Sequence, residues 1–165
     1  MFKKAIIALA TTFAMSAYAV DVPLTGTVDS KCVVTTDTNG IFGNPLPYRL
    51  STTQADGGVE PIVRYDVVQA DYYKALISHP ISFSESPTLN DVANWTGSIT
   101  VAEVSDPLMA DYDNTKRLYD NITEVDLSVT RSTWFKVSSQ ADYGFNKALP
   151  AGTYRAIVTA ECIAQ

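Results

Sequence analysis

Short segments in which apolar and polar residues alternate are the feature that most constrains the fold of this chain. Residues 122–129 show the alternation most clearly. Successive side chains of a β-strand point to opposite faces, so a segment of this kind buries one face in a core and presents the other to water. No convincing stretch has the 3.6-residue period of a helix. The sequence therefore predicts an all-β protein.

Most of the chain divides into such segments, which are rich in β-branched and aromatic residues and bounded by Gly, Pro, Asp or Asn. Predicted strands cover residues 20–28, 32–36, 62–68, 73–83 with a break at His79-Pro80, 97–104, 122–129, 134–137 and 153–163. Strands in this number without intervening helices favour antiparallel pairing in one domain. We therefore predict an immunoglobulin-like antiparallel β-sandwich, with an up-and-down barrel as the main alternative.

Three segments between these strands are predicted to be irregular. Residues 45–58 contain prolines and adjacent glycines, so they form a long loop or two very short strands that do not pair at the centre of a sheet. Residues 89–95 are suited to one helical turn, with Asn90 or Asp91 as its cap. Residues 106–121 are polar and predict a long surface loop.

The start of the chain has the three parts of a secretory signal peptide, residues 1–19. Two lysines form a basic start, residues 5–15 form an apolar run, and Ala-Tyr-Ala precedes the expected cleavage before Val20. A membrane anchor needs about twenty apolar residues, so this run is too short to be one. We expect an exported protein in which a segment, residues 20–31, precedes the sandwich domain, residues 32–165.

The acidic balance of the chain argues against nucleic acid as a partner. The chain contains 12 Lys and Arg and 18 Asp and Glu. Removal of the signal peptide takes away two basic residues and no acidic ones, which gives a net charge of 10 − 18 = −8. Binding to a phosphate backbone depends on clustered Lys and Arg, whereas here these residues are scattered along the mature chain.

The only two cysteines, Cys32 and Cys162, lie near the two ends of the mature chain. In an exported protein this placement predicts one disulfide that closes nearly the whole domain, and two buried free thiols are the alternative. Closing so long a loop stabilises the fold by about 4–5 kcal/mol through the entropy of the unfolded chain. Nucleophilic catalysis would have to use the single histidine, His79, directly before Pro80. We therefore expect no enzymatic activity.

Two pairs of acidic residues have both a chemical and a structural interpretation. Asp111 and Asp113 have calcium-like spacing, but no Glu follows at the offset of a full calcium loop, and turn formation explains the same residues. Glu124 and Asp126 could form the carboxylate pair of a glycosidase, yet a half-buried strand needs polar residues at these positions. The structural interpretation is favoured for both pairs, calcium at the first stays open, and no cofactor is predicted.

The two ends of the mature chain contain short motifs that belong together. In residues 25–34 a Gly-x-Val stretch leads into Cys32, and residues 149–158 contain the sequence Pro-Ala-Gly-Thr-Tyr. The first motif resembles the first strand of bacterial fimbrial subunits assembled by the chaperone–usher route. The second is similar to the start of the final strand in the same broad group of secreted proteins. The resemblance is limited to these two segments.

The resemblance implies an immunoglobulin-like domain that lacks one strand and is completed by an N-terminal segment donated from a neighbouring subunit. It also implies a fimbria outside the cell, reached through the periplasm, with neighbouring subunits, a periplasmic chaperone and an outer-membrane usher as partners. The first and last strands border the groove of such a domain, so a disulfide between Cys32 and Cys162 would tie its walls. The candidate donor face consists of the alternating residues Val20, Val22, Leu24, Gly26 and Val28.

This chain departs from the family in two ways. Fimbrial subunits with a disulfide usually link the first Cys to one some tens of residues further on, whereas here the only candidate is Cys162. In addition, only residues 20–31 precede Cys32 in the mature chain, and part of them could belong to its own first strand. A terminal subunit, a variant assembly and a self-complete monomer therefore stay open.

A secreted, monomeric carbohydrate-binding module is the alternative function. Trp95, Trp134 and the tyrosines could supply aromatic faces that stack on sugar rings. In a β-sandwich most such side chains pack in the core or in cross-strand pairs instead. The N-terminal segment would then pair within its own domain.

Overall fold

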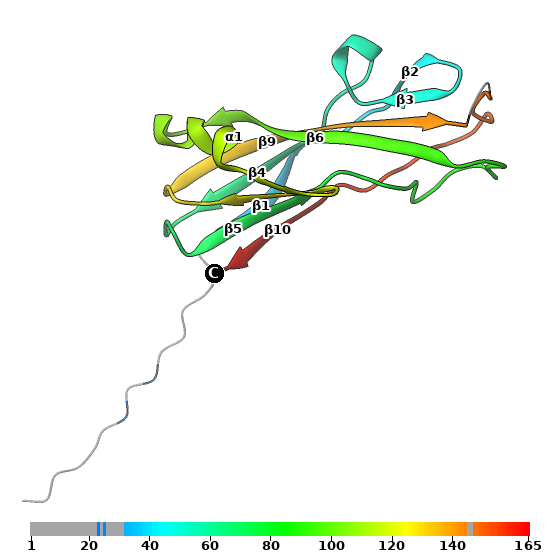
Figure 1. Ribbon diagram of the computed structural model, residues 1–165. Coiled ribbons are helices and arrows are strands. Elements are labelled where there is room, and N and C mark those ends of the chain that lie inside the picture. The colour runs from blue at the N-terminus through cyan, green and yellow to red at the C-terminus, as the bar shows by residue number, and fades with distance from the viewer. Residues whose placement is uncertain (1–22, 24, 26–31, 145–146) are drawn as a thin grey trace, which may run out of the picture.

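The computed structural model describes Pro23, Thr25 and residues 32–144 and 147–165. Its strands form two layers (Figure 1). The predicted signal peptide lies outside the described residues. All five residues of the candidate donor face also lie outside them: Val20, Val22, Leu24, Gly26 and Val28.

Two sheets form the layers, and every strand pair that the structure describes is antiparallel. The smaller sheet consists of β10 (Thr159–Ala164), β5 (Tyr73–Ser78), β8 (Ile122–Asp126) and β7 (Arg117–Tyr119), in that order. The larger sheet consists of β1 (Cys32–Thr38), β4 (Ile62–Val67), β9 (Arg131–Tyr143), β6 (Ala93–Val104), β3 (Arg49–Ser51) and β2 (Gly43–Leu46). The predicted all-β sandwich is confirmed. The barrel alternative is wrong, because the strands form two separate sheets rather than one closed sheet.

The central strand of the larger sheet is β9, which pairs on both sides. On one side β6 accompanies it from the pair Ala93–Tyr143 to the pair Val104–Thr133. On the other side β4 pairs with its first half and β3 with its second half. Every second side chain of β9 from Thr133 to Tyr143 is buried, so this strand contributes inward-facing side chains along its length.

The region of residues 45–58 differs from the prediction in one respect. It forms the short strand β3 and part of β2, which pair as a hairpin. Pro45 lies in β2, at the edge of the sheet, where a proline costs no ladder hydrogen bond. The strand β3 contains no proline and pairs with both β2 and β9. The alternative of two very short strands is confirmed, whereas the prediction that the region does not pair as a central strand is wrong for β3, which lies between β9 and β2.

The helical turns also lie elsewhere than predicted. A turn over residues 89–95 is wrong, because β6 begins within this segment and its first residues pair with the end of β9. The predicted loop of residues 106–121 contains two of the short helices and β7. Asp106 starts them, since its side chain accepts a hydrogen bond from the N–H of Leu108. The described helices are η1 (Gln54–Asp56), η2 (Pro107–Asp111) and α1 (Tyr112–Thr115). Among the described residues no helix is long and apolar enough to cross a membrane.

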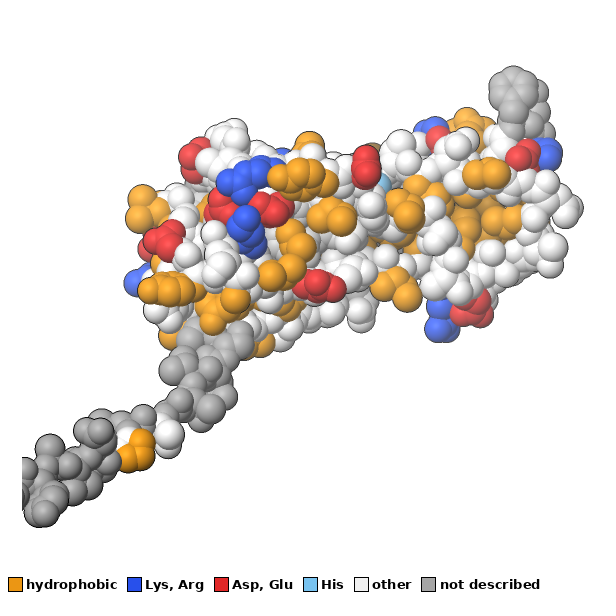
Figure 2. All heavy atoms as spheres, turned by 60° about the horizontal axis from the view of Figure 1, so that its bottom comes forward, with side chains coloured by type: hydrophobic (Ala, Val, Ile, Leu, Met, Phe, Trp, Pro, Cys, Tyr) orange, Lys and Arg blue, Asp and Glu red, His pale blue; other side chains and the backbone are white. Residues whose placement is uncertain are grey.

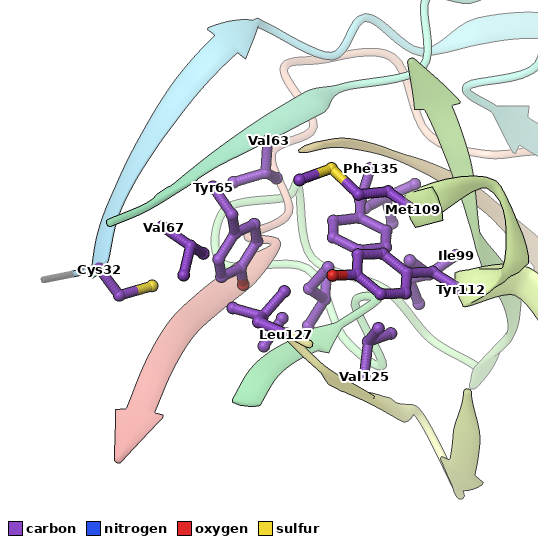
Figure 3. Close-up of a cluster of buried hydrophobic side chains, with 13 residues drawn as sticks. Cys32, Val63, Tyr65, Val67, Ile99, Met109, Tyr112, Val125, Leu127 and Phe135 are labelled. Carbon is purple, nitrogen blue, oxygen red and sulfur yellow. The ribbon is translucent and has the colours of Figure 1, made fainter. Parts of the chain in front are cut away.

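The main core lies between the sheets where β5, β8 and β10 face β4 and β9 (Figure 3). Tyr65 of β4 and Phe135 of β9 are fully buried and meet edge to face, with ring centroids 5.6 Å apart. The hydroxyl of Tyr65 donates to the carbonyl oxygens of Glu161 in β10, at 3.2 Å, and Leu76 in β5, at 3.3 Å. Burial raises the pKa of Tyr65, so the side chain stays a neutral donor that joins the two sheets.

Candidate functional site

The edge strands β1 and β10 run along the same side of the sandwich (Figure 1). Within the described part of the chain, β1 pairs with β4 alone and β10 pairs with β5 alone. Cys32 in β1 and Cys162 in β10 form a disulfide across this side, with their Cα atoms 6.3 Å apart. The predicted disulfide is confirmed, and the alternative of two free thiols is wrong.

A groove with a volume of about 470 Å³ opens between the two walls beyond the disulfide. The first wall is β1, and the second is the chain that leads into β10. The first wall contributes Val34, Thr35, Thr36 and Thr38, and the second contributes Ala156, Ile157, Val158 and Ala160. On the second wall the even-numbered residues are less exposed than the odd-numbered ones, as in an extended chain with one face turned inward. None of these eight residues is fully buried. Inward-facing residues of a complete sandwich would be buried, so the space between these two walls lacks, within the described residues, a strand that would cover them.

The last predicted strand, residues 153–163, forms only in its second half, as β10. In the first half, Arg155 makes an isolated bridge to Glu85. The even-numbered residues of 153–158 are nevertheless less exposed than the odd-numbered ones, as in a strand. On one side the neighbouring strand β5 ends just before His79, and on the other side lies the groove. The first half is therefore strand-like sequence whose main-chain pairing, among the described residues, is limited to the bonds of Arg155 with Ser84 and Glu85.

Ser139 of β9 lies on the floor of the groove and is 2% exposed. Its N–H donates to the Oγ1 of Thr52 at 2.8 Å, and that hydroxyl donates back to the carbonyl oxygen of Ser139 at 3.3 Å. The hydroxyl of Ser139 itself has no hydrogen-bond partner among the described residues. A buried polar group without a partner costs about 1–3 kcal/mol.

Four aromatic side chains, the aromatic cluster, lie at the opposite end of the groove from the disulfide. The ring of Phe83 is 4.8 Å from that of Trp95 and 5.1 Å from that of Tyr154, and Phe42 lies against the first two. All four are only partly buried. Phe42 and Tyr154 line a second hollow of about 640 Å³. The two hollows adjoin and form one groove, since they share Gly40, Phe42, Ala156 and Ile157.

The two tryptophans lie on opposite faces of the larger sheet. Trp95 pairs across the strands with the buried Ala141 and points between the layers. Trp134 lies on the outer face, where the guanidinium of Arg64 is 5.0 Å from its ring centre and its Nε1 donates to Asp37 at 3.2 Å. The two side chains therefore do not form a common platform on which a sugar could stack.

His79 lies at the end of β5 and has structural contacts. Its Nδ1 is 3.1 Å from the carbonyl oxygen of Pro80. Its main-chain N–H donates to the carbonyl of Asn121 at 3.1 Å, and the side-chain amide of Asn121 donates back at 3.0 Å. Its ring packs against Gly97 of β6, where a Cβ atom would come within 2.5 Å of the ring. These contacts anchor the end of β5 to its neighbours.

Glu124 and Asp126 form ion pairs on the outer face of the smaller sheet. Arg117 lies 2.6 Å from Glu124 and 2.8 Å from Asp126, and Lys74 lies 3.0 Å from Glu124. The hydrogen bonds from Lys74 and then from Arg117 lower the pKa of Glu124. A glycosidase acid needs a raised carboxyl pKa, so the direction is opposite to that chemistry. Figure 2 shows the densest cluster of charged side chains on one half of this face and hydrophobic side chains in a hollow of the other half.

Asp111 and Asp113 both hold the helical segment in place. The carboxylate of Asp113 accepts a hydrogen bond from the N–H of Val101 at 3.1 Å and pairs with Lys116 at 2.9 Å. Asp111 accepts a hydrogen bond from the side chain of Asn114 at 2.9 Å. Within the described ranges, no three His, Cys, Asp or Glu side chains are grouped so that they could hold a metal ion.

Comparisons with protein-family models, with curated proteins and with solved structures find no match for this chain. The groove is therefore identified as the candidate site from the geometry of its own residues alone. The sequence predicted the two walls as strands but did not single out their inward residues, such as Val34 and Val158, as a site. Their alternation was visible, whereas the gap between the walls depends on which strands pair.

Proposed function

We propose that this protein is a structural subunit of a fimbria and polymerises by strand donation. The groove of one copy accepts residues 20–28 of another, which add a strand between β1 and β10 and complete an immunoglobulin-like sandwich. The observation that carries the proposal is an open groove whose walls are the edge strand β1 and the extended chain that leads into the edge strand β10. The motifs at the two ends of the chain support it.

The length of the groove suits an extended segment of this kind. The wall that leads into β10 contributes lining residues from Tyr154 to Ala160, a span of about 23 Å at 3.3 Å per residue. Residues 20–28 span about 30 Å when extended. The candidate donor face and the less exposed residues of this wall both repeat every second residue. Val20, Val22 and Leu24 would face the core, and main-chain hydrogen bonds to the two edge strands would supply affinity.

The point at which the segment joins the domain favours donation to a neighbour. Residue 31 leads into Cys32, which the disulfide holds at one end of the groove. To enter its own groove, the segment would have to reverse direction in the few residues before Cys32. A segment from another copy needs no such turn. Because donor and acceptor surfaces differ, the contact is heterologous, and it produces a filament when successive rotations do not close a ring.

An open groove also accounts for the proposed route to the cell surface. Edge strands with unpaired main-chain groups are prone to incorrect association, so they need cover before assembly. We propose that a periplasmic chaperone supplies this cover, and that an outer-membrane usher exchanges it for the donor segment of the next subunit. The neighbouring copies, or related subunits, then become the permanent partners.

Charged residues in the donor segment test the proposal directly. The full chain with Val22→Asp and Leu24→Asp should lose detergent-resistant polymers and filaments, because carboxylates are costly to bury in an apolar groove. Its circular dichroism should remain that of a β protein. The matched control is Val68→Asp with Leu108→Asp, at side chains that are 71% and 74% exposed and lie outside the groove. Normal filament yield from the donor variant would refute the proposal.

A mixing experiment shows whether segment and groove meet. Ala156→Asp with Val158→Asp blocks the groove and leaves the donor segment intact, so this variant and the donor variant should each be monomeric. Mixed together they should form dimers and nothing longer, because one intact groove then accepts one intact segment. Size-exclusion chromatography with light scattering measures this. A mixture that stays monomeric would contradict strand donation, and monomeric wild-type protein would favour the carbohydrate-binding module.

A further inference from the structure

We infer that the Cys32–Cys162 disulfide is the blind end of the groove and sets the register at which a donated strand stops. The inference rests on the proposed function, because it concerns how the donor segment is placed in that groove. It assigns the disulfide a positioning role in addition to its contribution to stability.

The distance between the walls at the disulfide is too short for a strand to pass. Neighbouring strands lie about 4.8 Å apart, so two strands on either side of a third are separated by about 9.6 Å. The Cα atoms of Cys32 and Cys162 are 6.3 Å apart. A donated strand that pairs with both walls therefore has to end before it reaches them. The residues that line the groove agree with this limit, since they begin at Val34 in β1 and end at Ala160 in β10.

The space behind the disulfide is occupied by the core. Figure 3 shows Cys32 at the edge of the buried cluster, with Val67 and Tyr65 next to it. All three residues are buried, and the hydroxyl of Tyr65 donates to the carbonyl oxygen of Glu161 beside Cys162. An incoming side chain finds no room at this end. The groove is therefore closed by a covalent bond and by the packing behind it.

A closed end of the groove can select the register of the donated strand, which alternation of apolar side chains alone does not. A strand that slips by one residue turns its apolar face outward, which burial prevents, but a slip of two residues keeps the same face inward. The donor face of Val20, Val22, Leu24, Gly26 and Val28 repeats every two residues, so several registers bury apolar side chains. If the donated strand stops at the disulfide, only one of these registers fills the groove to its end. The wall from Tyr154 to Ala160 faces seven donor positions, and the remaining donor residues then extend past the aromatic cluster.

Hydrogen exchange maps where the donated strand ends. The assembled wild-type filament is compared with the monomeric full chain that has Val22→Asp and Leu24→Asp. Amides of residues 34–38 and 154–160 should gain protection on assembly, and the gain should end at Val34 and Ala160. In filaments of Cys32→Ser with Cys162→Ser, the gain should extend by about two residues on each wall, one register step.

Each outcome of this experiment bears on the inference. Identical boundaries in the two filaments, or a wild-type gain that continues past Val34 and Ala160, would overturn it while leaving strand donation in place. If the serine variant does not fold, the wild-type boundaries decide the matter alone. Wild-type protein that forms no filament would overturn the proposed function, and the inference with it.

Discussion

The two halves of the sandwich share β9 as their central strand but differ in what covers it. In the closed half, which contains the disulfide, β5, β8 and β10 form the second layer, and Tyr65 and Phe135 are fully buried. In the open half, the irregular segments 79–92 and 147–158 provide the cover, and the aromatic cluster is only partly buried. The comparison teaches that alternating strands bury their inner face only as well as the opposite layer allows. The candidate site lies where that layer is incomplete.

Removal of the disulfide should have the largest effect on this contrast. Cys32→Ser with Cys162→Ser opens a loop with a sequence separation of 130 residues, and the loop-closure entropy corresponds to about 5 kcal/mol. Urea unfolding, with Val22→Asp and Leu24→Asp present to keep the chain monomeric, measures the loss. A loss below about 1 kcal/mol would mean that packing alone closes this half.

One aromatic side chain from each half provides a matched comparison of packing. Phe135→Ala should lower the free energy of unfolding by about 3–5 kcal/mol, as expected for a fully buried phenylalanine. Phe83→Ala should cost about 1–2 kcal/mol in the monomer, because its ring is only partly removed from water. Chemical denaturation of the two monomeric variants tests the order. Equal losses would break the distinction between the halves.

The smallest expected effect concerns the ion pair that ties β3 to β9 in the open half. Arg49 contacts Asp142 at 2.6 Å, and this hydrogen bond is the main cause that lowers the pKa of Asp142. A lowered carboxyl pKa stabilises the fold above the ordinary value of about 3.9, and the stabilisation is lost as the pH falls through the lowered pKa. The pair is partly exposed, so about 1 kcal/mol or less is expected.

The variant Asp142→Asn isolates this contribution. Wild type should be the more stable of the two at pH 6, and the difference should disappear toward pH 2. Urea unfolding at both pH values measures it. A difference that grows on acidification would contradict the assignment, because the sign would then be that of a raised pKa.

The strands of this protein could be predicted where a segment with alternating residues also finds a neighbouring strand to pair with. The predicted segments 62–68 and 122–129 are close to β4 and β8, and the prediction of a single disulfide is confirmed. The helical turn at residues 89–95 was wrong because pairing with β9 overrides local propensity. The predicted strand 153–163 formed only where β5 offers a partner. The donor face and the signal peptide stay predictions.

By itself the sequence determined the fold class and the cysteine pair, because alternation is a local property of the chain and only two cysteines are present. Only the tertiary structure decided that β1 and β10 lie at one side with a groove between them. The reason is that a strand has two edges and two faces, and sequence specifies its faces through side chains while pairing with distant segments assigns its edges. The groove is defined by edges, so before the structure it was implied only by the resemblance, and its position and lining residues became visible only in three dimensions.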